Sequence, residues 1–152
     1  MKEPRDLYTK DKRRLRPDLQ MLINNRHILT DIQITNPLCP TSIQTTATQQ
    51  QLHAAGKKER IKSHKYVDTA LEHDAEFIPF IMEATGGMSE SAEKIYEMIV
   101  LASRHNNTLW PHEIIARDFR AAIAVAVQKR NAMTMIAGRA LAISGAATSI
   151  AA

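Results

Sequence analysis

Cysteine is nearly absent from the chain: Cys39 is the one cysteine among 152 residues. A single cysteine excludes an internal disulfide, and no Cys-x-x-Cys pair or His/Cys cluster with zinc-site spacing occurs in the sequence. Aromatic residues are also few, with three Phe, three Tyr and one Trp. We therefore expect a protein of a reducing compartment, either nuclear or cytoplasmic, that does not use disulfides for its stability.

Long hydrophobic runs are missing as well. No apolar segment approaches the roughly 20 residues that a membrane helix needs, and the charged start, Met-Lys-Glu-Pro-Arg-Asp, is unlike a signal peptide. The sequence thus predicts no membrane association. A hydrophobic content of 44% and a charged content of 24% are ordinary for a globular domain, and the length suffices for one domain with its own core.

Positive charge is present but unevenly distributed. Residues 1–16 hold seven Lys/Arg and three Asp/Glu, a net charge of +4, and residues 52–66 hold five Lys/Arg and one Glu, another +4. The formal charge of the whole chain is only +4, so the remainder carries −4. Two basic patches of this kind would attract a polyanion such as nucleic acid, although a solvated basic face and a tail would have the same composition.

A pair of aspartates marks the two ends of an expected hairpin. Two short apolar runs flank Asn24-Asn25, and Asn tolerates the positive φ that a two-residue turn requires. With the turn at this pair, the numbers of cross-strand partners sum to 49, so Asp18 and Asp31 lie opposite each other on one sheet face. Two facing carboxylates repel each other unless a cation lies between them, and their hard oxygens suit Mg²⁺ or Mn²⁺. By the two-residue period of a strand, Arg16 and Gln33 share this face.

The rest of the chain predicts helices around a small sheet. Residues 49–72 are expected to be helical, with three lysines on one face, and residues 75–82 form a short apolar run that predicts a buried strand. Residues 41–48 predict a polar loop. Two further helices are expected, one after Ser89 as N-cap and one that begins near Pro111. The fold class is therefore α/β, a short mixed β-sheet of hairpin plus buried strand covered by helices.

Four motifs in this order resemble the restriction-like endonuclease domain of non-LTR retrotransposons, a branch of the PD-(D/E)XK superfamily. The motifs are Arg16-Pro17-Asp18, Asp31-Ile32-Gln33, Lys62-x-x-Lys65-Tyr66, and the strand Phe77-Ile-Pro-Phe-Ile-Met-Glu83 before Gly86-Gly87. The resemblance extends over residues 14–140 and is strongest over 16–87. It implies a truncated PD-(D/E)XK nuclease-like core with C-terminal helices. Its domains are a basic arm at 1–15, the nuclease-like domain at 16–131, and an Ala-rich helix or tail at 132–152.

The function implied by the resemblance is metal-dependent DNA cleavage, the nick at which a retrotransposon primes reverse transcription. In that interpretation Asp18 and Asp31 bind Mg²⁺ or Mn²⁺, and the partners are DNA and an upstream reverse transcriptase in the parent element. The superfamily usually has a lysine where this chain has Gln33, so Lys62, and after it Lys65, becomes the candidate for the basic catalytic role. Glu83 is either a third acid or an outer-shell partner. The expected DNA-contacting residues are Arg13, Arg14, Arg16, Lys58, Lys62 and Lys65.

Two other classes of function remain open at this stage. The first is a non-catalytic retrotransposon-derived module that binds nucleic acid, because the chain has only about 15 residues where the family has a helix and a first strand. A structural helical partner protein is the second, which would account for the C-terminal apolar stripes but not for the aspartate pair. The sequence does not indicate an oligomeric state.

Overall fold

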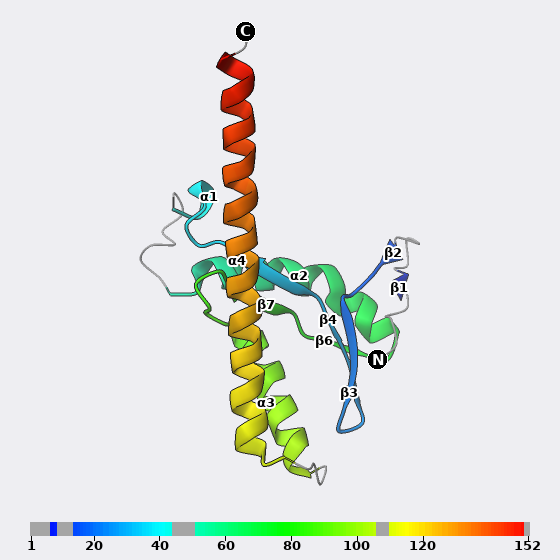
Figure 1. The fold of residues 1–152 in the computed structure, drawn as a ribbon. Coiled ribbons are helices and arrows are strands. Elements are labelled where there is room, and N and C mark those ends of the chain that lie inside the picture. The colour runs from blue at the N-terminus through cyan, green and yellow to red at the C-terminus, as the bar shows by residue number, and fades with distance from the viewer. Residues whose placement is uncertain (1–6, 9–13, 44–50, 106–109, 151–152) are drawn as a thin grey trace. The chain divides into compact units, whose positions relative to one another are not determined.

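The computed structural model describes residues 7–8, 14–43, 51–105 and 110–150 (Figure 1). The chain divides into two compact units, residues 1–116 and residues 117–152. The elements, in chain order, are β1 (Leu7–Tyr8), β2 (Arg14–Leu15), β3 (Leu19–Ile23), β4 (Arg26–Thr30), β5 (Ile32–Thr35), α1 (Pro40–Ile43), α2 (His53–Glu72), β6 (Glu76–Phe77), β7 (Phe80–Glu83), α3 (Glu90–His105) and α4 (His112–Ile150).

The predicted hairpin is confirmed. Asn24 and Asn25 adopt φ values of 49° and 59°, the two consecutive positive values of a type I′ turn. Strands β3 and β4 pair antiparallel from Ile23 opposite Arg26 to Leu19 opposite Thr30, so partner numbers sum to 49 as expected. The turn chemistry of two asparagines therefore sets the register of both strands.

The second half of the sheet is parallel. β6 pairs with β4 and β7 pairs with β5, both in parallel register. The expected single strand at 75–82 is interrupted at Pro79, because proline has no N–H group to donate. Backbone hydrogen bonds continue on either side of it: the N–H of Ile78 donates to the carbonyl oxygen of Leu29, and that of Phe80 to the carbonyl oxygen of Asp31, both at 3.0 Å. The three strands β3, β4 and β6 thus form a mixed sheet, with one antiparallel and one parallel pairing, and β5 and β7 form a second parallel pair directly after it.

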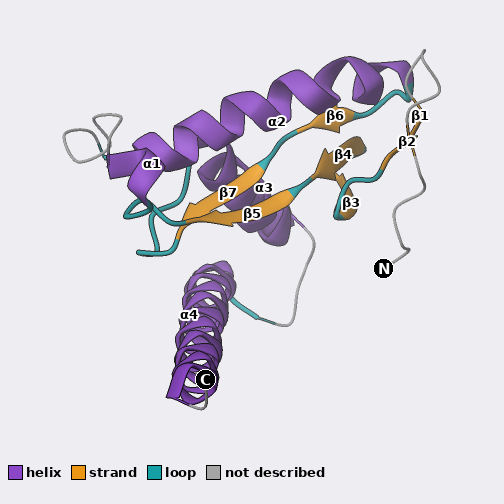
Figure 2. Ribbon diagram, turned by 90° about the horizontal axis from the view of Figure 1, so that it is seen from above, coloured by secondary structure: helices purple, strands orange, loops and turns teal. Residues whose placement is uncertain are grey.

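Helices α2 and α3 lie on opposite faces of this sheet (Figure 2). The side chains of Leu29, Tyr66, Ala70, Ala75 and Phe77 form a buried cluster between the sheet and α2. On the other side, the hydroxyl of Ser91 in α3 donates to the carbonyl oxygen of Pro79 at 2.7 Å. This α/β arrangement of a small mixed sheet and covering helices is the predicted fold class.

The helix predictions hold with shifted boundaries. α2 begins at His53 rather than near residue 49, and Ser89 caps α3, because its hydroxyl accepts the Ala92 N–H at 3.3 Å. The prediction of a polar loop over 41–48 is wrong at its start, where Pro40–Ile43 forms α1, since Pro suits the first helical turn. Residues 44–50 lie outside the described part of the chain. In the arm, β1 and β2 pair antiparallel.

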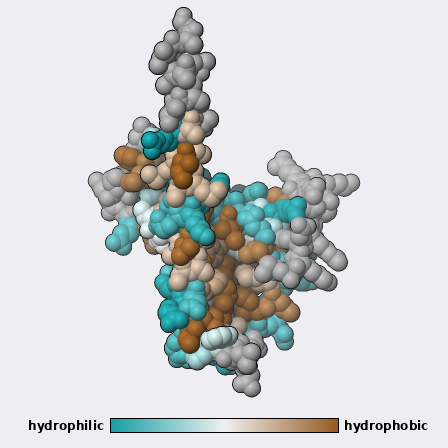
Figure 3. All heavy atoms as spheres, in the orientation of Figure 1, coloured by the Kyte–Doolittle hydropathy of each residue, from teal (hydrophilic) through white to brown (hydrophobic). Residues whose placement is uncertain are grey.

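Most of unit 2, residues 117–152, is the continuation of α4, so the Ala-rich segment continues the preceding helix up to Ile150. Hydrophobic and hydrophilic side chains alternate along its surface (Figure 3), and the exposed hydrophobic ones include Val125, Met133, Met135 and Ile136. Over the described residues, the helices contain no stretch long and apolar enough to cross a membrane.

Candidate active site between the hairpin and α2

The predicted aspartate pair lies at the open end of the hairpin. Asp18 directly precedes β3 and Asp31 directly follows β4, and the adjoining residues Leu19 and Thr30 are paired, so each aspartate lies at the end of a hairpin strand. Asp18 is exposed and its Oδ2 accepts the backbone N–H of Ile32 at 2.7 Å, while Asp31 is only 6% exposed. The two carboxylates therefore occupy adjoining positions, one facing solvent and one buried under α2.

Helix α2 supplies both partners of the buried carboxylate. The ammonium group of Lys62 forms an ion pair with Oδ2 of Asp31, and the hydroxyl of Tyr66 hydrogen-bonds with Oδ1 at 3.3 Å. Lys62 and Tyr66 are one helical turn apart, so they lie on the same face of α2, the face that packs on the sheet. Both oxygens of Asp31 are thus engaged by one helix.

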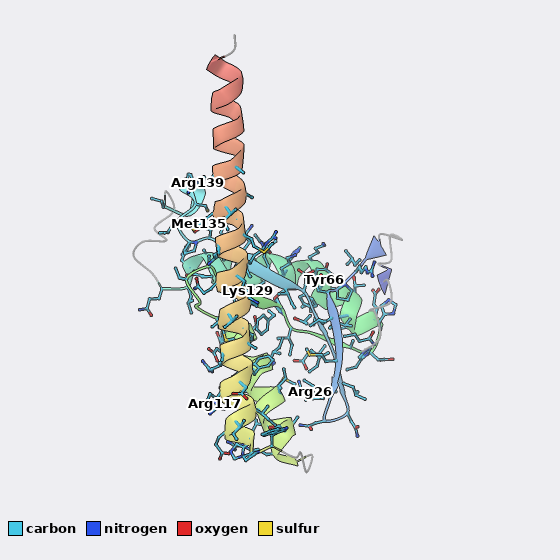
Figure 4. All side chains as sticks on the ribbon, viewed as in Figure 1. Arg26, Tyr66, Arg117, Lys129, Met135 and Arg139 are labelled. Atoms are coloured by element: carbon cyan, nitrogen blue, oxygen red, sulfur yellow. The ribbon has the colours of Figure 1, made fainter. Side chains whose placement is uncertain are left out.

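Tyr66, labelled in Figure 4, carries the hydroxyl that contacts Asp31. Its ring stacks on Phe77, with centroids 4.6 Å apart and an angle of 15° between the planes. Burial raises the pKa of Tyr66 to about 12, with further contributions from the charge of Asp31 and the hydrogen bond to it. The hydroxyl consequently keeps its proton at neutral pH and can act as a donor.

The other predicted site residues are distributed around this centre. Lys65 points to Tyr66, with its ammonium nitrogen 3.4 Å from the hydroxyl and 4.7 Å from the ring centroid. Arg16 has an exposed side chain, and its carbonyl oxygen lies 3.3 Å from the Tyr66 hydroxyl. Gln33 is half-buried in β5 opposite Ile81, and Lys58 is half-buried one turn before Lys62. Arg13 lies outside the described residues, and only the backbone of Arg14 is described.

Glu83 is the last residue of β7, and its side chain lies at the N-terminal turn of α2. Its side chain is buried, its Oε1 accepts the backbone N–H of Ala55 at 3.4 Å, and the hydroxyl of Thr85 lies 3.5 Å from Oε2. Leu52, which precedes α2 with a φ of 57°, provides no side-chain cap. Glu83 therefore serves as the acceptor for the N-terminal turn of α2, where a negative charge is also favoured by the helix dipole.

The donor set at Asp18 and Asp31 fits a hard divalent cation. Mg²⁺ is commonly held by one or two carboxylates, and its other positions are filled by water and by phosphate oxygens of a substrate. In the part of the chain that the structure describes, no three His, Cys, Asp or Glu side chains gather as a metal-binding group. Two carboxylates are therefore what these residues can offer such an ion, and one of them, Asp31, also pairs with the ammonium group of Lys62.

Sequence reasoning singled out Asp18, Asp31 and Lys62 but gave Tyr66 no chemical role. The spacing of Tyr66 one turn after Lys62 was the available signal, since it places both residues on one helix face. No family model, curated protein or solved structure matches the chain.

Proposed function

We propose that this chain is a metal-dependent DNA endonuclease domain of the restriction-like type, which nicks target DNA for retrotransposon integration. The observation that carries the proposal is the Asp31–Lys62 ion pair next to Ile32, whose backbone N–H donates to Asp18, so that two carboxylates and a cationic side chain lie near one another. Such a combination promotes phosphodiester hydrolysis, because a metal ion held by carboxylates and a cationic side chain offset the negative charge that develops on the phosphate as water attacks.

Each residue has a distinct role in this proposal. Asp18 and Asp31 hold Mg²⁺ or Mn²⁺, which, when bound, lowers the pKa of water and offsets charge on the phosphate. Lys62 holds its ammonium group at the buried carboxylate, from where it stabilises the attacking oxygen or the phosphate. Lys65, Lys58 and the arginines of the arm contact the DNA backbone, which positions the strand without reading its sequence.

Nicking of supercoiled plasmid tests the proposal. The protein is expected to produce open-circular plasmid with Mg²⁺ or Mn²⁺ and none with EDTA, while DNA binding persists in EDTA. Binding without any nicking in either metal contradicts it. A preparation of the Asp31→Ala variant serves as the control for a contaminating nuclease, because a contaminant would nick equally in both samples.

The second candidate function is a nucleic-acid-binding module without cleavage. Gln33 favours it, because this neutral side chain stands where the superfamily usually has a lysine, and Lys62 already neutralises Asp31. Such a module binds DNA in a salt-dependent manner and nicks none of it with Mg²⁺ or Mn²⁺. The plasmid experiment separates the two functions.

A further inference from the structure

The hydroxyl of Tyr66 lies among three groups that belong to the site. It is 3.3 Å from the carbonyl oxygen of Arg16, 3.3 Å from Oδ1 of Asp31 and 3.4 Å from the ammonium nitrogen of Lys65. Both oxygens are acceptors at the same distance, so they share the single hydroxyl proton, whereas Lys65 donates to the hydroxyl oxygen. A structural core tyrosine needs only one such partner.

The ring of Tyr66 cannot move this hydroxyl away. The residue is 3% exposed and its ring is stacked on Phe77 within a buried cluster. The phenol oxygen lies on the long axis of the ring, so rotation of the ring about that axis leaves the oxygen in place. The packing of the core therefore fixes the position of a polar atom at the edge of the site.

The segment that leads into β3 and the junction between β4 and β5 meet at this atom. Arg16 precedes Asp18 by two residues, and Asp31 contacts the hydroxyl directly. Lys62 engages the other oxygen of Asp31, so the carboxylate can rotate only if contacts with both α2 residues break.

We propose that Tyr66 is a positioning residue, whose hydroxyl fixes the carboxylate of Asp31 relative to the backbone leading to Asp18 so that both carboxylates bind one divalent cation. The inference rests on the proposed function, since it concerns the same pair of acids. Without the hydroxyl, the ring still fills the core, but Oδ1 of Asp31 loses its donor and the carbonyl of Arg16 is no longer tied to it. The pair then binds a cation with a less well-fixed geometry.

Calorimetric titration of the Tyr66→Phe variant with Mg²⁺ tests this role. The dissociation constant for Mg²⁺ is expected to rise about tenfold, the effect of losing one hydrogen bond to a charged group. Nicking should fall at low Mg²⁺ and recover as Mg²⁺ is raised. The matched control is Tyr96→Phe, which removes a hydroxyl whose partner is the backbone carbonyl of Ala116 at 3.4 Å, and its Mg²⁺ affinity should stay unchanged.

A second measurement does not depend on the folding of the Tyr66→Phe variant. Replacing Tyr8 and Tyr96 by Phe leaves Tyr66 as the one tyrosine of the chain. Addition of Mg²⁺ should then change the near-ultraviolet absorption of tyrosine, because the carboxylate that contacts its hydroxyl gains a cation. An unchanged spectrum during Mg²⁺ binding overturns the inference.

The outcomes separate this inference from the proposed function. Equal Mg²⁺ affinity of the wild type and Tyr66→Phe overturns the positioning role even if the wild type nicks DNA. A tenfold weaker affinity in a protein whose wild type never nicks supports the positioning role and overturns the nuclease. Absence of Mg²⁺ binding in the wild type overturns both.

Discussion

The ammonium group of Lys62 is the cationic group that the structure pairs with Asp31. We expect Lys62→Ala to lower the nicking rate about a hundredfold at saturating DNA, the usual loss when a charge-stabilising donor is removed. Gln33→Ala should have a smaller effect, since this side chain carries no charge. Lys58→Ala is the control for simple phosphate contact: it should weaken DNA binding and reduce the salt slope by about one unit with turnover unchanged. Equal turnover of the wild type and Lys62→Ala would transfer the role to Lys65.

Glu76 provides a test of the electrostatics away from the site. Burial by itself raises the pKa of Glu76, but hydrogen bonds from Lys94 and Arg26 outweigh it and hold the pKa below 4.5. A lowered pKa in the folded state means that the contribution of Glu76 to stability is complete above pH 4.5 and is lost as the pH falls through the lowered pKa.

Unfolding by urea at a series of acidic pH values measures this contribution. The wild type should lose more stability than Glu76→Gln between pH 4.5 and the lowered pKa, and Glu97→Gln, an exposed residue of α3, should behave like the wild type. Parallel pH profiles for the wild type and Glu76→Gln would show that the ion pairs with Arg26 and Lys94 contribute nothing.

At the scale of elements, the hairpin turn sets the register on which the aspartate pair depends. Asn24 and Asn25 both have positive φ, which an alanine adopts only at a cost of about 1 kcal/mol. Asn25→Ala should therefore lower the free energy of unfolding by about that amount, whereas Asn25→Gly should leave it unchanged or raise it, because Asn-Gly is the preferred type I′ pair. Equal stabilities of the two variants would mean that the turn does not hold this register.

The same elements show what the sequence can and cannot predict. The hairpin, its register and the three lysines of α2 follow from local rules, since turn residues and helical spacing act over a few positions. The role of Tyr66 depends on how deeply α2 sits on the sheet, and the capping of α2 by Glu83 joins residues 28 positions apart. Neither follows from a local pattern. α1 at Pro40–Ile43 was missed because a polar run of Thr and Ser also predicts a loop.

At the scale of the whole molecule, charge distribution governs DNA binding. Six basic side chains are candidates for phosphate contact, namely Arg13, Arg14, Arg16, Lys58, Lys62 and Lys65. If all six engage, the logarithm of the binding constant should fall with the logarithm of salt concentration with a slope of magnitude about 5. Fluorescence anisotropy with labelled duplex DNA at several salt concentrations measures this slope. A slope near zero would contradict a backbone-binding role for these patches.

The aspartate pair also determines how the stability of the protein should change when one of the two carboxylates is replaced by a neutral amide. On sequence grounds, two facing carboxylates gain stability when one is neutralised. The structure alters this expectation for Asp31, because Lys62 already compensates its charge, and Asp31→Asn should lower the free energy of unfolding by about 2 kcal/mol. Stability measurements on this variant are therefore needed beside any activity measurement.

The central claim is that Asp18 and Asp31 together form the cleavage site. Its most direct test is the single-turnover nicking rate with Mg²⁺ at saturating DNA for Asp18→Asn, Asp31→Asn and the control Asp68→Asn, an exposed residue of α2. The account predicts that both site variants bind DNA and stay folded but lose nicking by at least about a hundredfold, while Asp68→Asn nicks like the wild type. Wild-type nicking rates in either folded site variant would contradict it.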